Sequence, residues 1–498
     1  MTGPARPARP EEITVHVSHH VDGAALDSAD GRTFECVSPI DNSVVATVAL
    51  GGQAEVDAAV ASARAAFRGW SRTPVAQRAA VLHRVADLID ARRDELADWE
   101  TRDMGIPVSD ARAVDVPRSA AVFRFFADWA TQVGSESYSD PAAGTLTYTL
   151  REPLGVVAAI APWNLPLLTM AWKVAPALAF GNTVVAKPAE QSPLTATFLA
   201  RICTEAGLPD GAYNVVHGFG PGSAGEALTR HPDVDGVAFT GASSTGRVLM
   251  RDGSASLKRL SLELGGKSAT IVAEDADLDV AVPGAVRSIV SNAGQLCVAG
   301  SRALVHRSIY DEFLSRVVDE LAGWTQGDPR DPATRLGPLV TAEHLDRVLG
   351  YVDLAREEGA KVLTGGGRPT DPALADGNFL QPTVLVDVHN GMRCVREEIF
   401  GPVLAVMPFD TIEEAIDIAN DSPYGLAGSV WTRSLETAQT VAREVRTGNM
   451  WVNCFSVRDL RAPFGGFKDS GIGREGGDHS LEFYTELKSV VLKTSPAQ

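Results

Sequence analysis

The 498-residue sequence has few cysteines and no excess of basic charge. Its five cysteines are scattered without C-x-x-C pairs. This spacing argues against a disulfide framework and a structural metal site, and it favours a reducing, cytoplasmic setting. Lysine and arginine number 45 against 63 aspartates and glutamates, which gives a formal net charge of -18. Without a long basic block, nucleic acid and anionic membrane surfaces are disfavoured as partners.

Long hydrophobic runs are also missing. The longest apolar stretch, Leu165 to Phe180, contains Lys173 and two prolines and falls short of the roughly 20 residues that span a bilayer. We therefore expect no transmembrane helix. The segment Met1 to Pro10 lacks the apolar core of a secretory signal and is predicted to be a short disordered tail. The length indicates two or three globular domains.

Strand-like and helix-like segments alternate from Arg151 onward. Short apolar runs, one of them ending at Thr240, are separated by longer segments with helical spacing, and this pattern predicts a parallel, doubly wound sheet. Two helical patterns, Gln53 to Trp70 and Pro74 to Thr101, are expected to pack on its outside. A second alternation runs from Ser268 to about Asn453 and predicts a second α/β domain.

Two segments alternate polar and apolar residues with a period of two, as exposed strands do. They are Gly144 to Leu150 and Ser489 to Thr494. Taken alone, each is predicted to be an edge strand, and edge strands need a partner or a protective charge.

A candidate nucleophile and a candidate base stand about thirty residues apart. Cys297 lies in G-Q-L-C-V-A-G-S-R, and Glu263 begins E-L-G-G-K. A thiolate that adds to an aldehyde gives an alkoxide that expels hydride, and the resulting thioester needs a base to activate water. We assign these roles to Cys297 and Glu263. Taken singly, a buried packing cysteine and a glutamate at a strand end remain the alternatives.

A candidate oxyanion site follows the first strand of the predicted sheet. Asn164 ends the segment A-P-W-N, and its side-chain amide can donate to the forming alkoxide together with the backbone N–H of Cys297. The alternative is that Asn164 caps the helix that begins at Leu165. The two roles are compatible.

The usual dinucleotide fingerprint G-x-G-x-x-G does not follow the first strand. The segment F-T-G-A-S-S-T-G, from Phe239 to Gly246, instead offers a glycine turn before a helix start, where backbone N–H groups can meet a pyrophosphate. Lys187 and Glu190 follow another predicted strand and are candidates to hold the adenosine ribose. A carboxylate at that ribose repels a 2′-phosphate, so NAD is favoured, while Lys187 leaves NADP possible.

The order and spacing of these motifs resemble the aldehyde dehydrogenase superfamily from about Val21 to Leu492. The resemblance implies two doubly wound α/β domains and a small β ribbon that joins subunits into a homodimer or homotetramer. It implies an NAD-binding domain at 14–133 and 151–264, a catalytic domain at 265–460, and oligomerisation segments at 134–150 and 480–498. The implied reaction is the NAD-dependent oxidation of a small-molecule aldehyde to a carboxylic acid, without a metal.

The resemblance also assigns further residues. Glu398 would hold the nicotinamide ribose, Phe400 would line the nicotinamide ring, and Lys173 matches a proton-relay position that Glu100 or Glu475 could partner. Gly241 and Gly246 match the phosphate motif, in which Ala242 replaces the usual serine, so that the backbone and Ser243 would have to suffice. The remaining implied cofactor contacts are Ile160, Ala161, Pro162, Trp163, Gly220, Phe239 and Leu264.

The segment Asn453 to Gly477 points to a substrate class. Its V-R-D-L-R run resembles the branch that oxidises 2-hydroxymuconic and 2-aminomuconic semialdehydes, and Arg118 matches the other substrate arginine of that branch. These substrates carry a carboxylate remote from the aldehyde, which a guanidinium binds through two parallel hydrogen bonds. Arg458 or Arg461, together with Arg118, would form this clamp.

Three alternatives differ in what they require. A broad-specificity enzyme for aliphatic or aromatic aldehydes needs no clamp and leaves these arginines as surface charges. Thioester transfer to coenzyme A is disfavoured because relatives with that activity generally lack the base that Glu263 provides. A catalytically inactive binding protein would have lost Cys297, Asn164 or Glu263, and all three are present.

Overall fold

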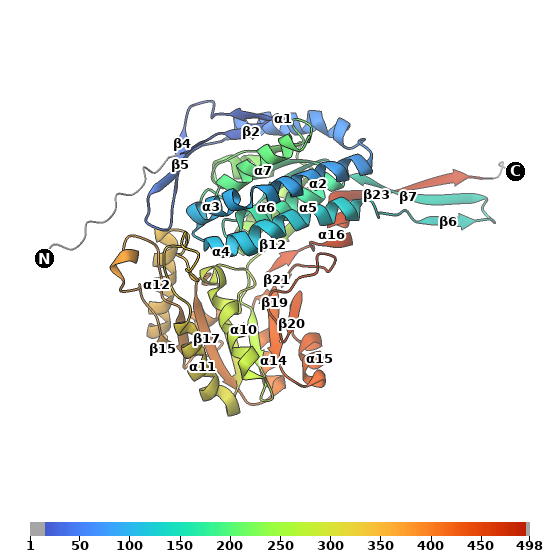
Figure 1. Cartoon of the computed structure of the whole chain (residues 1–498). Coiled ribbons are helices and arrows are strands. Elements are labelled where there is room, and N and C mark those ends of the chain that lie inside the picture. Colours follow the sequence, from blue (N-terminus) through green and yellow to red (C-terminus); the bar gives the residue numbers. More distant parts are fainter. Residues whose placement is uncertain (1–14, 495–498) are drawn as a thin grey trace.

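The computed structural model describes residues 15 to 494. The predicted tail at Met1 to Pro10, residue 14 and the last four residues of the segment 480–498 lie outside the described residues. Two large sheets flanked by helices lie one above the other, and a narrow ribbon projects from the upper part (Figure 1). No helix within residues 15 to 494 combines the length and apolar character needed to cross a membrane.

The first large sheet has the strand order β22-β12-β11-β8-β9-β10-β2-β3. Its five central strands are parallel, and the short strands at its two edges are antiparallel. The central strands are β8 (Val156–Ile160), β9 (Thr183–Lys187), β10 (Tyr213–Val215), β11 (Gly236–Thr240) and β12 (Arg259–Glu263). The edge strands are β2 (His19–Val21), β3 (Ala24–Leu26) and β22 (Gly471–Ile472).

The topology of this sheet places a binding edge between β8 and β11. From β8 the chain runs to β9 and β10 on one side and then crosses to β11 and β12 on the other. Doubly wound sheets bind ligands at such a switch point, outside the carboxyl ends of their strands. Every residue of β8 and β9 is buried, which explains their continuous apolar runs. The predicted first sheet is confirmed.

Helices cover both faces of this sheet. They are α1 (Gln53–Trp70), α2 (Val75–Ala91), α3 (Arg93–Met104), α4 (Val108–Asp110), α5 (Val116–Ala130), α6 (Pro166–Ala179), α7 (Leu194–Glu205), α8 (Ala224–Arg230), α9 (Ser243–Gly253) and α16 (Gly477–Tyr484). The helical pattern predicted from Pro74 to Thr101 is two helices, because Arg92 leaves the helical conformation with φ -106° and ψ 22°.

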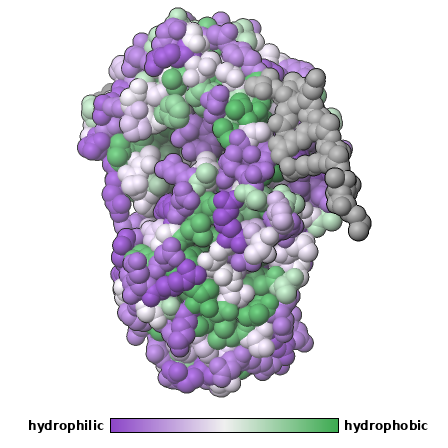
Figure 2. Space-filling view, turned by 90° about the vertical axis from the view of Figure 1, so that its left-hand side faces the viewer, coloured by the Kyte–Doolittle hydropathy of each residue, from purple (hydrophilic) through white to green (hydrophobic). Residues whose placement is uncertain are grey.

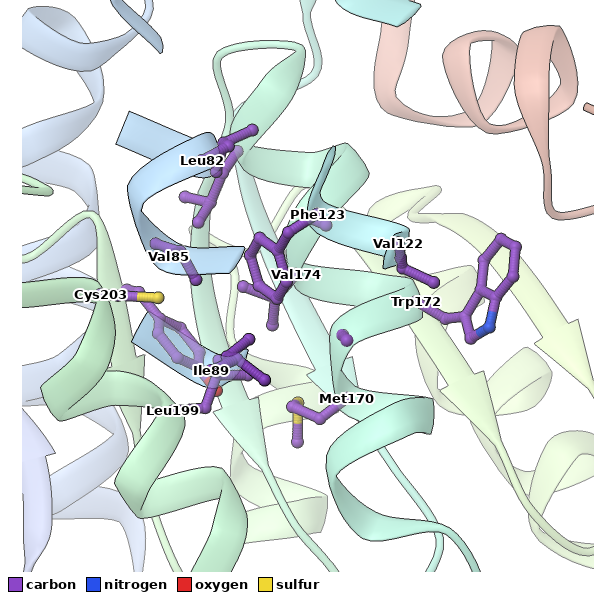
Figure 3. Packing of buried hydrophobic residues seen from close by; sticks show 14 of the residues in the cluster. Leu82, Val85, Ile89, Val122, Phe123, Met170, Trp172, Val174, Leu199 and Cys203 are labelled. Atoms are coloured by element: carbon purple, nitrogen blue, oxygen red, sulfur yellow. The ribbon is translucent and has the colours of Figure 1, made fainter. Parts of the chain in front are cut away.

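The main core lies between helices that are far apart in the sequence (Figure 3). Its labelled side chains come from α2, α5, α6 and α7: Leu82, Val85, Ile89, Val122, Phe123, Met170, Trp172, Val174, Leu199 and Cys203. Trp172 lies at the margin of this group, with its indole turned away from the centre. The same side chain also lines the site described below.

The second large sheet has the order β15-β16-β17-β14-β13-β19-β20 and is parallel except at β15. Its strands are β13 (Ala269–Val272), β14 (Arg302–His306), β15 (Lys361–Thr364), β16 (Thr383–Val386), β17 (Val403–Phe409), β19 (Ala427–Trp431) and β20 (Asn449–Val452). The helices of this half are α10 (Leu278–Val290), α11 (Tyr310–Ala322), α12 (Ala342–Glu357), α13 (Arg393–Arg396), α14 (Ile412–Asn420) and α15 (Leu435–Glu444).

Three small sheets complete the fold. One contains β1 (Val15–Val17), β4 (Thr33–Val37) and β5 (Val44–Ala49), and another pairs β18 (Tyr424–Gly425) with β21 (Phe467–Lys468). The third is the projecting ribbon of β6 (Ser137–Asp140), β7 (Thr145–Pro153) and β23 (Thr485–Lys493) (Figure 1). β7 and β23 pair along their full lengths, so each strand is longer than the sequence pattern predicted. β23 is an edge strand as predicted, but the same prediction for β7 is wrong, because β7 lies between β23 and β6.

Candidate active site

A cavity of about 1020 Å³ opens at the carboxyl edge of the first sheet and is lined by both halves of the chain. The first sheet contributes the residues after β8, β11 and β12, among them Asn164 and Glu263. The second half contributes the segment after α10, with Cys297, and the loop after β20, with Arg458. The cavity therefore gathers the predicted nucleophile, base and oxyanion donor in one place.

A strained turn delivers Cys297 to this cavity. Asn292, Ala293 and Gly294 all have left-handed φ values, of 50°, 52° and 73°. A Cβ at Gly294 would lie 2.3 Å from the carbonyl oxygen of Gly401, so only glycine fits there. Burial, with added effects of Glu398 and Glu263, raises the pKa of the Cys297 thiol to about 12. The group that the turn presents is therefore a neutral thiol at pH 7.

Asn164 is tied to the turn that carries Cys297. Its Nδ2 donates to the carbonyl oxygen of Gln295 at 2.7 Å, and Asn292 Nδ2 donates to the carbonyl oxygen of Asn164 at 2.8 Å. An amide nitrogen has two hydrogens, so Asn164 keeps a second donor for a group in the cavity. The helix-cap alternative is not observed, because α6 begins at Pro166 without a side-chain cap.

Glu263 is the last residue of β12, and its carboxylate is buried in the cavity wall. Neither carboxylate oxygen has a hydrogen-bond partner among residues 15 to 494. Burial holds the pKa of Glu263 well above its usual value; Glu475 raises it further, while Lys173 and Arg458 lower it. A Cβ at Gly465 would lie 2.7 Å from Glu263 Oε1, so glycine leaves room for this side chain.

Lys173 reaches this region from α6. Its Nζ pairs with Glu475 Oε1 at 3.1 Å, and both side chains are buried or nearly so. Glu100, the other partner considered from sequence, lies elsewhere: its Oε1 accepts from the backbone N–H of Leu167 at 2.8 Å. Glu475 is thus the partner of Lys173, and Glu100 instead accepts from a backbone N–H in the first turn of α6.

Glu398 and Phe400, for which the resemblance predicts contacts with the nicotinamide ribose and ring, both line the cavity. Glu398 Oε1 accepts from the backbone N–H of Gly266 at 2.8 Å, and a Cβ at Gly265 would lie 2.2 Å from Glu398 Oε2. The two glycines therefore form a cradle for this carboxylate. Phe400 packs edge to face on Trp163, with ring centroids 5.3 Å apart. All of these groups except Gly266 line the cavity.

The phosphate motif has the predicted local structure, with one difference. β11 ends at Thr240 and α9 begins at Ser243, so the first-turn N–H groups of α9 lack helical partners. The hydroxyl of Ser243, however, donates to the carbonyl oxygen of Asp469 at 2.8 Å, and the N–H of Gly241 donates to the carbonyl oxygen of Glu263 at 3.0 Å. The Ser243 hydroxyl is therefore already used as a donor in this conformation, and its role at a phosphate stays a prediction.

Lys187 and Glu190 form a pair just past β9. Lys187 Nζ lies 3.2 Å from Glu190 Oε2 and donates to the carbonyl oxygen of Pro188 at 3.0 Å. Burial lowers the pKa of Lys187. Pro162, Trp163, Gly241 and Leu264 line the main cavity, whereas the remaining predicted cofactor residues lie outside its wall: Ile160, Ala161, Lys187, Glu190, Gly220, Phe239, Ser243 and Gly246.

The structure separates the two candidate arginines of the substrate loop. The guanidinium of Arg458 lies 3.6 Å from the Trp172 ring centroid and 4.1 Å from that of Phe464. Its Nε and Nη2 are buried without a hydrogen-bond partner among the described residues, and it shares the cavity wall with Arg118. Arg461 instead forms an exposed ion pair with Asp459 at 2.6 Å outside the cavity wall. The inclusion of Arg461 in the clamp is therefore wrong.

Several wall residues were not identified from the sequence. The aromatic side chains of Trp172, Trp451, Phe455 and Phe464 surround the region of Arg458 and Cys297. No local motif marks them, since they come from separate elements. Within residues 15 to 494, histidine, cysteine and acidic side chains form no group that could hold a metal ion.

Two stacked doubly wound sheets with a thiol, an amide and a carboxylate at their junction define an oxidoreductase architecture, and comparisons with known proteins identify the family. The family model described as "Aldehyde dehydrogenase family" matches residues 26–490, and this chain belongs to that family. The 2-hydroxymuconic semialdehyde dehydrogenase of Pseudomonas sp. (strain CF600) is 49% identical over 482 residues, covering 96% of this chain and 99% of the relative.

The chain is also similar to a human enzyme and to a solved structure with bound cofactor. The human mitochondrial aldehyde dehydrogenase is 45% identical over 472 residues, covering 94% of this chain and 90% of that protein. A crystal structure of indole-3-acetaldehyde dehydrogenase in complex with NAD+ superposes with a TM-score of 0.94 at 44% identity, covering 97% of this chain and 98% of that one. The predicted fold class and the prediction of an aldehyde dehydrogenase are confirmed.

Proposed function

We propose that this aldehyde dehydrogenase oxidises a carboxylate-bearing semialdehyde from aromatic ring cleavage, such as 2-hydroxymuconic semialdehyde, with NAD as the cofactor. The observation that carries the proposal is the buried guanidinium of Arg458, which has two unpartnered nitrogens in the cavity that contains Cys297. A buried donor without a partner is costly, so it indicates a ligand that supplies the acceptor. The name of the Pseudomonas relative supports the same substrate class.

The covalent step belongs to Cys297 and Asn164. Because burial raises the pKa of the thiol to about 12, its proton passes to solvent water at the open cavity as the C–S bond forms and the carbonyl π bond becomes an alkoxide. The free N–H of the Asn164 amide and the backbone N–H of Cys297 then donate to the new alkoxide. NAD, when bound, would supply the hydride acceptor for this carbon, and Cys297 would then hold the acyl group as a thioester.

Glu263 serves the second half of the reaction. The burial that raises its pKa also makes its carboxylate a stronger base than an exposed one, and this carboxylate removes a proton from the attacking water. That water attacks the thioester carbon, and the acid leaves while the Cys297 thiol is restored. The Lys173–Glu475 pair acts on the charge of Glu263, since Glu475 raises the pKa of this carboxyl group and Lys173 lowers it.

The residues present fit NAD. The first turn of α9 offers unpartnered N–H groups to a pyrophosphate, and the glycine cradle presents Glu398 to a ribose. At the expected position of the adenosine ribose, Glu190 places a carboxylate beside Lys187, and the negative charge of this carboxylate disfavours a 2′-phosphate. NADP is the alternative that an assay with both cofactors tests.

We further propose the domain roles and assembly. Residues 14–133 and 151–264 form the NAD-binding domain and residues 265–460 the catalytic domain. Segments 134–150 and 480–498 join subunits into a homodimer or homotetramer, because the ribbon exposes apolar side chains such as Leu487 and Val491 on unpaired edges. Five free cysteines support a reducing, cytoplasmic location.

The test of the substrate class is the formation of NADH with three aldehydes. 2-Hydroxymuconic semialdehyde, benzaldehyde and a short aliphatic aldehyde are compared, with Cys297→Ala as the blank. We expect kcat/KM to favour the semialdehyde by about 100-fold or more, roughly 2.7 kcal/mol of transition-state discrimination. Comparable kcat/KM values for all three aldehydes would instead establish a broad-specificity enzyme and contradict the proposed carboxylate clamp.

A further inference from the structure

The cavity wall carries three guanidinium groups beyond those of the proposed clamp. One of them, Arg347 on α12, donates to the carbonyl oxygen of Glu398 at 2.9 Å. Arg287, on α10, and Arg335, in the loop before α12, line the same cavity as Cys297. Both side chains are exposed, whereas Arg118 and Arg458 are half-buried. Arg287 and Arg335 therefore form an exposed pair, the outer pair, in the same cavity wall as the two half-buried arginines of the proposed clamp.

The outer pair is not neutralised by its surroundings. The guanidinium of Arg287 has no hydrogen-bond or ion-pair partner within residues 15 to 494, and Arg335 lies over the Trp324 ring at 4.2 Å while donating to the carbonyl oxygen of Gly323. Asp110 is the cavity carboxylate whose charge interacts with both arginines. One carboxylate cannot balance two guanidiniums, so this end of the cavity keeps a positive excess.

The acidic side chains deeper in the cavity do not cancel that excess. The charge of Asp115 interacts with Arg118, that of Glu263 with Lys173 and Arg458, and that of Glu398 with Lys267 and Arg347. Glu475 is paired with Lys173. A local positive field matters here because the chain as a whole carries a formal charge of -18 and repels anions.

Figure 2 shows one face of the molecule, on which hydrophilic atoms cover much of the margin and apolar atoms gather in the middle and lower half. The formal net charge of -18 repels an anionic aldehyde. Such a substrate therefore needs a local attraction before it can reach Cys297. Clefts lined by one sign of charge concentrate field lines and raise the rate at which opposite charges enter.

We propose that Arg287 and Arg335 form an electrostatic entrance that captures anionic aldehydes and passes the carboxylate to Arg118 and Arg458. This inference rests on the proposed carboxylate-bearing substrate. Exposed charges at the rim of a site act on the rate of capture and are screened by salt, whereas buried paired charges act on the lifetime of the complex. The entrance therefore raises kcat/KM for anionic aldehydes at low ionic strength and leaves kcat unchanged.

The experiment compares two aldehydes that differ only in a carboxylate, 4-carboxybenzaldehyde and benzaldehyde. For the full-length double variant Arg287→Gln/Arg335→Gln at about 20 mM salt, we expect kcat/KM for 4-carboxybenzaldehyde to fall roughly threefold to tenfold. At about 500 mM salt the Debye length is shorter than about 10 Å, so charges act only over short distances and the difference in kcat/KM from wild type should nearly vanish. Benzaldehyde should show no difference at either salt concentration.

Two further variants complete the test. Arg307→Gln removes an exposed guanidinium that pairs with Asp410 away from the cavity, and it should leave both aldehydes unaffected. Arg287→Gln alone avoids disturbing the Arg335–Trp324 stack and should give a smaller loss with the same salt dependence. Three results would contradict the proposed entrance: an equal fall of kcat/KM at both salt concentrations, an equal fall for benzaldehyde, or no fall for 4-carboxybenzaldehyde at low salt.

The outcome is separable from that of the proposed function. If wild-type enzyme shows no preference for 2-hydroxymuconic semialdehyde, the proposed substrate fails. The salt-dependent difference between the two benzaldehydes still decides whether the outer arginines act on anions, because it requires only a carboxylate.

Discussion

The guanidinium of Arg458 lies 3.6 Å from the centroid of the Trp172 ring, and Trp172 packs edge to face on Phe126 with ring centroids 6.1 Å apart. Phe126 is fully buried in the core between α5 and α6. Trp172 is thus one of the core residues that also line the cavity, together with Ile106, Val122 and Leu168. A cation held on a rigid aromatic surface loses little entropy when it binds a carboxylate, which favours tight recognition.

The reactivity of Cys297 should rise with pH in the free enzyme. Since burial raises the pKa of its thiol to about 12, the thiolate fraction at neutral pH is small and grows about tenfold per pH unit. Alkylation by iodoacetamide between pH 7 and 10, followed by mass spectrometry at Cys297, should show this slope. Cys297→Ala provides the background labelling. A plateau below pH 8 would mean that the thiol is already ionised.

Glu263→Gln should separate the two halves of the reaction. Loss of the base slows thioester hydrolysis, so turnover should fall by about 100-fold to 10,000-fold while hydride transfer persists. Rapid mixing should then show one equivalent of NADH per site, followed by a slow phase. Glu397→Gln is the matched control, because that carboxylate pairs with Arg393 outside the cavity wall and its loss should leave turnover within about twofold. Absence of the burst in Glu263→Gln would assign this glutamate to the first half instead.

Gly265→Ala should weaken cofactor binding. The added Cβ would lie 2.2 Å from Glu398 Oε2, so the carboxylate must leave its cradle. We expect the Kd for NAD, measured by fluorescence titration without substrate, to rise roughly tenfold, about 1.4 kcal/mol. Gly350→Ala is the control, because a Cβ there meets nothing within 4 Å. Unchanged NAD binding in Gly265→Ala would exclude Glu398 from the cofactor site.

Much of this site could be predicted from the sequence because parallel strands end on one edge of a sheet. The motifs that contain Asn164, Thr240 and Glu263 each follow a buried strand, and the switch between β8 and β11 brings them together. The strained turn at Asn292 to Gly294 can be inferred from the local sequence, because asparagine and glycine tolerate the positive φ values observed there. For these residues, the local sequence motif and the topology of the sheet predict the same position.

The choice between Arg458 and Arg461 could not be predicted in this way. Both stand in one irregular loop, and what separates them is a contact with Trp172, which belongs to a helix distant in the sequence. The use of the Ser243 hydroxyl by Asp469 is likewise a long-range contact. The break between α2 and α3 at Arg92 carries no glycine or proline signal.

The central claim is tested most directly by the Michaelis constants of Arg458→Gln and Arg461→Gln with 2-hydroxymuconic semialdehyde and benzaldehyde. Each variant removes one guanidinium from the same loop, but only Arg458 faces the cavity. The account predicts that Arg458→Gln raises KM for the semialdehyde about tenfold to 100-fold, as expected for a lost charge-assisted pair of hydrogen bonds, with little change for benzaldehyde. Arg461→Gln should match wild type with both. Equal effects of the two variants, or an equal rise for benzaldehyde in Arg458→Gln, would contradict a carboxylate clamp at Arg458.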